Sequence, residues 1–93
     1  MKGFVKDPNA TLDYSFDWSP WLGTDTIATS QWTIEPSGLS VVPASETIYD
    51  NDTKTRVFVT GGALKEEYIL TNTITTNASR TDERSVQISI RNR

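Results

Sequence analysis

The chain of 93 residues is long enough for one modest hydrophobic core, so a single domain over residues 1–93 is expected. It contains no cysteine and no histidine, which excludes disulfides, the common zinc sites, haem ligation and Ser-His-Asp triads. The net charge of −3 argues against a general nucleic-acid binder. No apolar run approaches the roughly 20 residues that span a bilayer, and the N-terminal stretch lacks a signal peptide's apolar core, so neither membrane insertion nor conventional export is expected.

The first predicted element is a strand over residues 12–18, where apolar and polar side chains alternate. Its inward face would carry Leu12, Tyr14, Phe16 and Trp18. The carboxylates of Asp13 and Asp17 would then face water. Burial of the four apolar side chains makes this stretch a strand of the core rather than a ligand site.

A single helical turn is predicted next, over residues 19–23. Ser19 is placed as its N-cap, Pro20 at the first helical position and Gly23 at its exit. Trp21 and Leu22 would lie at one end of the core. They could either close that end or anchor a partner protein.

Further strands are predicted wherever residues alternate between turn signals. Their ranges are 28–34, 39–41, 55–59, 66–76 and 84–91. Residues 44–53 are rich in turn formers and are interpreted as a loop that could hold a short edge strand.

Short alternating strands without an amphipathic helix predict an all-β fold, an immunoglobulin-like antiparallel β-sandwich of about seven strands. The strands over 12–18 and 28–34 would correspond to B and C, and the last two to the F–G hairpin. Tyr68 stands two residues before Leu70, where a tyrosine corner would precede the second core cysteine. An apolar pair would replace the disulfide.

The run from Arg80 to Ser85 is the main candidate for a contact surface. Arg80, Asp82 and Arg84 would fall on one side where the last strand begins. Such a row of alternating charge could pair across strands or with a partner. A surface pair of this kind within one molecule contributes under about 1 kcal/mol.

Catalytic and metal sites find little support in the sequence. Asp13 and Asp17 would be about 13 Å apart on a strand, whereas paired glycosidase carboxyls lie within roughly 10 Å. Residues 50–53 offer oxygen ligands, but their spacing matches no EF-hand loop, which favours a turn. We therefore predict no catalytic residue, metal, cofactor or small-molecule substrate, and keep a hydrolase using Asp13, Asp17 or Glu67 only as an alternative.

Several short motifs resemble, in order and spacing, one family of small tailed-bacteriophage virion proteins, the phage fiber-tail adaptor proteins. They are Lys6-Asp7-Pro8, Leu12-Asp13-Tyr14, Asp17-Trp18, Trp21-Leu22, Thr26-Ile27-Ala28, Trp32-Thr33, Gly38-Leu39, Gly61-Gly62, Tyr68, Asn72, Ile74-Thr75-Thr76 and Arg80 to Ser85. The resemblance covers nearly the whole chain. It implies a β-sandwich building block of the virion without enzymatic activity.

The function expected from this resemblance is that of an adaptor in the phage particle, assembled in the bacterial host cytoplasm. It would join tail or fibre components, or neck and head components, through protein-protein contacts, in several copies. The partner-binding residues predicted are Trp21, Leu22, Arg80, Asp82 and Arg84. The alternative is a carbohydrate-binding module of a host-recognition fibre, with Tyr49, Phe58 and Trp21 as the sugar platform.

Overall fold

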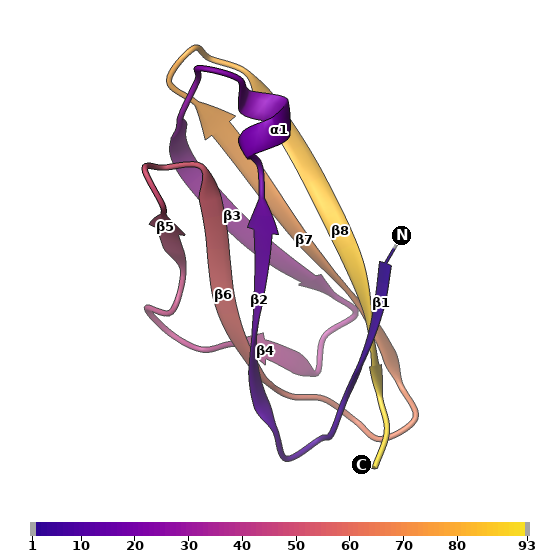
Figure 1. Cartoon of the computed structure of the whole chain (residues 1–93). Coiled ribbons are helices and arrows are strands. Elements are labelled where there is room, and N and C mark those ends of the chain that lie inside the picture. The colour runs from indigo at the N-terminus through magenta and orange to yellow at the C-terminus, as the bar shows by residue number, and fades with distance from the viewer. Residues whose placement is uncertain (1, 93) are drawn as a thin grey trace.

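The computed structural model describes residues 2–92, which form eight strands and one short helix (Figure 1). The strands are β1 (Lys2–Lys6), β2 (Thr11–Asp17), β3 (Ile27–Glu35), β4 (Leu39–Val41), β5 (Thr47–Tyr49), β6 (Lys54–Gly61), β7 (Glu67–Thr76) and β8 (Thr81–Ile90). The helix, α1 (Ser19–Leu22), follows β2 directly.

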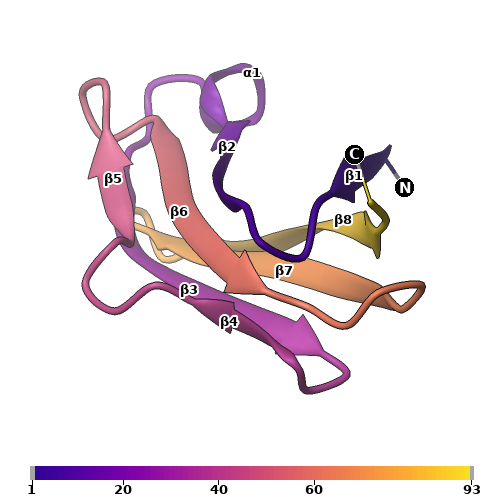
Figure 2. The same cartoon turned by 90° about the horizontal axis from the view of Figure 1, so that it is seen from below.

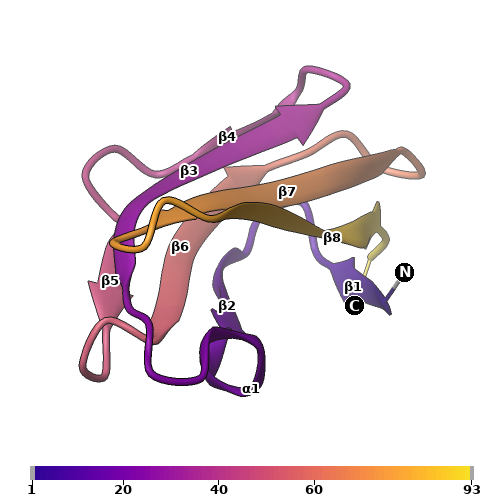
Figure 3. The ribbon, with the colours of Figure 1, turned by 90° about the horizontal axis from the view of Figure 1, so that it is seen from above.

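The strands form two sheets that pack face to face. One sheet has the order β1-β8-β7-β3, and the other has β2-β6-β4 with β5 also paired to β6. All pairs are antiparallel except β1 with β8, which are parallel. Both end-on views place β1 on the opposite side of the molecule from β5 (Figures 2 and 3). The predicted β-sandwich, with its last two strands as a hairpin, is confirmed.

Two features at the N-terminal side of the structure differ from what the sequence indicated. The strand β1 was not predicted, because a five-residue segment with a glycine shows no clear alternation. Leu12 was placed in the core, yet it is exposed. Its side chain lines a groove between β1 and β2, where it remains open to solvent.

The core has two parts. The larger lies between the sheets and includes Tyr14, Trp32, Leu39, Val57, Val59, Tyr68, Leu70, Val86, Ile88 and Ile90. The smaller lies at the end that carries α1 and includes Trp18, Leu22, Ile27 and Ile74. Leu70 is fully buried at the position predicted to replace a disulfide cysteine.

A buried hydrogen-bond network around Asn72 lies on β7 between these two parts. The Asn72 side-chain oxygen accepts from Trp18 Nε1 at 3.1 Å and from the Thr55 hydroxyl at 2.6 Å. Its amide nitrogen donates to Ser30 Oγ at 2.8 Å and to the Gln31 carbonyl at 3.0 Å. The hydrogen-bonding capacity of this buried amide is therefore fully used, and it links both sheets.

The predicted tyrosine corner forms at the start of β7. The Tyr68 hydroxyl accepts a hydrogen bond from the Ala63 amide at 3.0 Å, and the Tyr68 ring is buried. Gly38 packs against it so closely that a Cβ there would lie 2.8 Å from the hydroxyl, and its φ of +125° also suits only glycine. The corner thus fixes the β6–β7 connection against the turn before β4.

Substituting Tyr68→Phe is expected to lower the free energy of unfolding by about 1–2 kcal/mol, because the Ala63 amide would lose its partner. Urea denaturation followed by circular dichroism measures the change. Tyr49→Phe is the matched control, since the Tyr49 hydroxyl forms no hydrogen bond within residues 2–92. Equal midpoints for the two variants would contradict the role of the corner.

Candidate contact surface at one end of the sandwich

The helix α1 is set by Asp17 rather than by Ser19. Ser19 was predicted as the N-cap, but the helix begins at Ser19 and the capping position is Trp18, which makes no side-chain cap. Instead, the Asp17 carboxylate accepts hydrogen bonds from the Ser19 amide at 3.0 Å and the Ser19 hydroxyl at 2.7 Å. These two bonds, the hydroxyl first, lower the pKa of Asp17. Its carboxylate reaches the orphan amide of the first turn and so displaces the predicted cap.

Two tryptophans meet where β2 passes into α1. Trp18 is completely buried, and its ring packs edge-on against Trp21 with the centroids 5.7 Å apart. Trp21 is half-buried. Leu22, predicted as a contact residue, is only 3% exposed and belongs to the core. It therefore holds α1 in place and has almost no surface with which to touch a partner.

Two arginines from the β7–β8 hairpin cover these indoles. The guanidinium of Arg80 lies 4.3 Å from the centroid of Trp21, and that of Arg84 lies 4.1 Å from the centroid of Trp18. Each arginine also bonds the α1 segment: Arg80 donates to the Leu22 carbonyl at 2.9 Å and Arg84 to the Asp17 carbonyl at 3.0 Å. We call Trp18, Trp21, Arg80 and Arg84 the arginine–tryptophan end.

Arg80 is held further by Asp25, in the loop after α1. Its Nε donates to the Asp25 carboxylate at 3.1 Å, and the Asp25 side chain is largely buried. Asp82, the acid predicted to stand between the two arginines, instead accepts a hydrogen bond from the Glu83 amide at 2.9 Å. Arg80 therefore pairs within the molecule, with the loop after α1, which is one of the two possibilities predicted for this row.

The fold brings together most of the predicted contact residues. Trp21, Arg80 and Arg84 are in one cluster, and Asp82 follows Arg80 on the strand that carries Arg84. An open, shallow depression beside them is lined by Leu22, Gly23, Thr24, Asp25, Ala78 and Arg80. Sequence reasoning missed Asp25, because it stands in a loop without pattern. It also missed Trp18's place in this cluster, since the alternation assigned that ring only to the core.

Comparison with known proteins identifies the chain. The family described as podophage GP4 fiber-tail adaptor protein gp77 matches residues 6–89. The chain belongs to this fiber-tail adaptor family. It is therefore a structural protein of the phage particle rather than an enzyme, as its motifs indicated.

One solved structure similar to this adaptor protein is the solution structure of the PKD domain from KIAA 1837 protein. The two share 17% sequence identity with a TM-score of 0.57, over 98% of this chain and 79% of that chain. At this identity the likeness concerns the fold alone, and it supports the immunoglobulin-like sandwich. No curated protein matches the adaptor chain.

The other candidate residues are the carboxylates that were considered for a hydrolase. Asp13 and Asp17 are exposed, as predicted. Glu67 accepts a hydrogen bond from Gln87 at 2.9 Å and pairs with Arg91 at 3.5 Å. Across residues 2–92 the acidic side chains form no group of three or more that could hold a metal ion, and α1 is too short to cross a membrane.

The aromatic residues considered as a sugar platform are each approached by an arginine. Arg56 lies over Tyr49 at 5.0 Å and over Phe58 at 6.0 Å from the ring centroids, and Arg80 covers one face of Trp21. No specific contact in the described part of the chain favours the carbohydrate-binding alternative.

The hydrogen bonds to Asp25 predict how the stability of the protein changes in acid solution. Hydrogen bonds from the Thr76 hydroxyl first, then from the Thr26 amide, Arg80 and the Ala78 amide, lower the pKa of Asp25, although burial opposes them. Its contribution to stability is then present above the unfolded-state pKa of about 3.9 and is lost as the pH falls through the lower folded-state pKa. Asp25→Asn should be less stable than the parent at neutral pH, and the two should converge in acid.

Urea midpoints measured from neutral to acidic pH test this expectation. The Asp13→Asn variant serves as the control, because it removes a carboxylate from an exposed position outside this hydrogen-bond network. A constant difference between Asp25→Asn and the parent down to the lowest pH would show that the carboxylate's charge is not what matters.

Proposed function

We propose that this fiber-tail adaptor protein joins other tail or fibre proteins through Trp21, Arg80, Asp82 and Arg84. The observation that carries the proposal is the stacking of Arg80 and Arg84 on two indoles at one end of the sandwich. Tryptophan and arginine are the residues most enriched among binding hot spots. Concentrating both at one end suits a surface that is buried against a partner.

Arg80 is the centre of the proposed contact. Its side chain is 43% exposed although it is fixed by Asp25, the Leu22 carbonyl and the Trp21 ring. A side chain already held in one position loses little rotamer freedom on binding, which favours affinity. The N–H groups of Arg80 that these contacts leave unused can donate to a carboxylate or carbonyl oxygen of the partner.

Several copies of the adaptor would act together in a particle. A symmetric arrangement repeats one contact many times, so that individually weak contacts give a stable assembly. The position of these copies, whether in the tail, in the fibre, or at the neck and head, is read directly from cryo-electron microscopy of the particle.

The test is complementation of a phage that lacks this gene with variants of the chain. Arg80→Gln removes the charge at the proposed contact. Arg91→Gln is a matched control, because Arg91 has the same 43% side-chain exposure and also pairs with a carboxylate, but it follows β8 at the other end. Incorporation of each variant into purified particles is quantified by mass spectrometry.

We expect Arg80→Gln to reduce incorporation by at least tenfold, as the loss of a hot-spot residue would, while Arg91→Gln assembles like the parent. Thermal melts of the purified variants establish that each remains folded. A folded Arg80→Gln protein that assembles at the parent level would overturn the proposed contact surface.

A further inference from the structure

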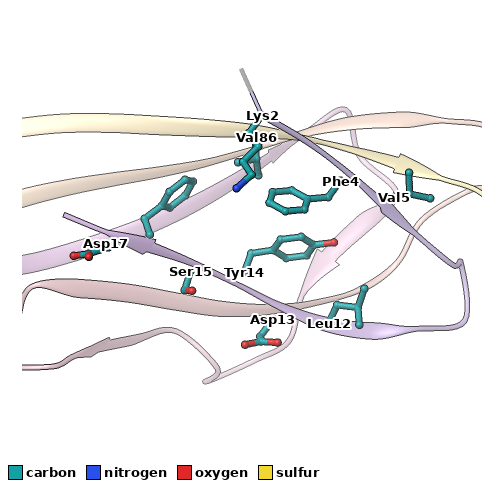
Figure 4. A pocket seen from close by; sticks show the side chains of 10 residues that line it. Lys2, Phe4, Val5, Leu12, Asp13, Tyr14, Ser15, Asp17 and Val86 are labelled. Atoms are coloured by element: carbon teal, nitrogen blue, oxygen red, sulfur yellow. The ribbon is translucent and has the colours of Figure 1, made fainter. Parts of the chain in front are cut away.

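A groove runs along the open side of the sandwich, between the edges of its two sheets. It has a volume of about 430 Å³ and is lined by residues 12–17 of β2, by Lys2, Phe4 and Val5 of β1, and by Val86 of β8 (Figure 4). Successive residues of a strand point to opposite faces, so a run of six lining residues means that the groove follows the edge of β2. Within residues 2–92, β2 pairs with β6 alone.

The groove combines exposed apolar side chains with the polar Lys2, Asp13, Ser15 and Asp17, and it also contains a buried polar group without a partner. The large hydrophobic side chains exposed within residues 2–92 are Val5 (44%), Leu12 (38%) and Leu64 (43%), and the first two line it. Tyr14 is only 8% exposed, and its buried hydroxyl has no hydrogen-bond partner. In Figure 4 this hydroxyl lies between β1 and β2, beside Phe4.

The backbone of β2 presents hydrogen-bonding groups to the groove. In an antiparallel ladder, residue pairs that bond each other alternate with pairs whose groups point away. Asp13 opposes Phe58, whose carbonyl accepts from the Val42 amide at 2.8 Å, on the far side from β2. Asp13, and by alternation Ser15, therefore direct their N–H and C=O groups toward the free edge.

The next outward-pointing residue shows that this edge can be occupied. The Asp17 carbonyl, two residues beyond Ser15, accepts from Arg84 at 3.0 Å, a donor on the other sheet. The backbone groups of Asp13 and Ser15 lie further along the same edge, beside the apolar part of the groove. A strand of a partner would satisfy them, as a neighbouring strand does at any sheet edge, and would be the fifth strand of this sheet.

We propose that the groove between β1 and β2 binds an extended segment of another virion protein, which adds a strand to β2 and carries alternating apolar and basic side chains. The inward, apolar side chains of the segment would cover Val5 and Leu12. The outward side chains would stand beside Asp13 on the exposed face, where a lysine or arginine would form a cross-strand pair. The side chains of the segment alternate because successive residues of an added strand point in turn to the groove and to the exposed face.

Charge argues against a second copy of this chain as the occupant in the register centred on Ser15. Two β2 strands paired antiparallel about Ser15 would place Asp13 of one directly opposite Asp17 of the other. Like charges in directly opposite positions destabilise a strand pair. Acidic side chains on an open edge are a device by which sheets avoid pairing with themselves, and the same charges select a basic partner.

The test uses particles assembled from a chain with p-benzoylphenylalanine in place of Ser15, a photocrosslinker at the rim of the groove. Ser40, an exposed residue of β4 at the far edge of the same sheet, is the matched control position. We expect crosslinks from position 15 to a segment of a different virion protein in which apolar residues alternate with lysine or arginine. Crosslinks to another copy of this chain, to a segment without that alternation, or none at all would overturn the proposal.

Two substitutions complete the experiment. Ser15→Pro removes an N–H that points to the groove while leaving the β2–β6 bonds intact, and Asp13→Lys reverses the charge. Each should reduce incorporation into particles at least tenfold. If Ser15→Pro fails to fold, Asp13→Lys and the crosslink decide, and a folded variant that assembles normally contradicts the strand addition.

This inference rests on the proposed function only in requiring another virion protein as the partner. Arg80 does not line the groove, so the Arg80→Gln and Asp13→Lys experiments report on separate surfaces. Normal assembly of Arg80→Gln together with loss of assembly in Asp13→Lys would leave the groove as the contact and remove the arginine–tryptophan end. Loss of assembly in Arg80→Gln together with normal assembly of Asp13→Lys would leave the arginine–tryptophan end as the contact and remove the groove.

Discussion

The Trp18→Ala variant is expected to lose most of its stability, by about 3–5 kcal/mol. Trp18 is completely buried at the junction of β2 and α1, where it packs against Trp21 and beneath Arg84. Its removal leaves a large cavity and takes one donor from Asn72. Because domains of this size are stabilised by only about 5–15 kcal/mol, the variant should be close to unfolding at 37 °C. Urea denaturation followed by near-ultraviolet circular dichroism measures the loss.

Two further variants separate the parts of this effect. Trp18→Phe keeps an aromatic ring but lacks the indole N–H, so it should fall between the parent and the alanine variant. Trp21→Ala, at a half-buried ring of the same cluster, should cost clearly less than Trp18→Ala. If the two alanine variants were equally stable, the smaller part of the core would not depend on Trp18.

The Asn72→Asp variant is expected to show the second large loss of stability, and this loss should depend on pH. At neutral pH it would bury a carboxylate that faces the Gln31 carbonyl, at a cost above about 3 kcal/mol. Burial raises the folded-state pKa of such a group above its unfolded value of about 3.9, so the variant should lose stability as the pH rises above about 4. Urea midpoints between acidic and neutral pH measure this dependence.

Ser30→Ala is the control for the Asn72 network. It removes one of the four hydrogen bonds of the amide without adding a charge, and should cost about 1 kcal/mol at every pH. A pH-independent loss in Asn72→Asp would mean that the carboxylate finds solvent or a counter-ion, and that the site is less enclosed than its burial indicates.

The strands that were predicted well are those with long, strict alternation. β7 and β8 each bury every second residue over much of their length, and the period of two is read directly from the sequence. The tyrosine corner at Tyr68 was predictable for a similar reason, since it depends on a fixed offset within one strand. β8 begins at Thr81 rather than at residue 84, because the hairpin with β7 extends the ladder into the charged run.

Features that depend on long-range contacts could not be predicted. β1 is a strand because β8 offers it an edge, and nothing in its own five residues requires this. Leu12 follows the alternation of β2, but its side chain lines the groove between β1 and β2 and stays exposed. A local pattern states which side chains share a face, and the arrangement of the sheets decides which of them are covered.

Most side chains of the arginine–tryptophan end were singled out in the sequence, but the bonds that they form were not. The row of Arg80, Asp82 and Arg84 was expected to pair across strands or with a partner, and the bonds of the two arginines to the α1 segment and Asp25 were not foreseen. The spacing of charges on one strand carries no information on a loop that folds back from a distant part of the chain. The resemblance to the adaptor family indicated the function, while the geometry was needed to show which side chains meet.

The parallel pairing of β1 with β8 has a consequence for the order of events on the ribosome. Lys2 pairs with Val86 and Lys6 with Ile90, and the buried Lys6 ammonium also donates to the Gly61 carbonyl at 2.7 Å. Contacts between residues so distant in sequence are slow to form because a long loop must close. β1 can pair only after β8 has been synthesised, so the groove that β1 borders cannot form on a chain that lacks β8. The groove proposed to bind a partner strand would therefore be available only on completed chains.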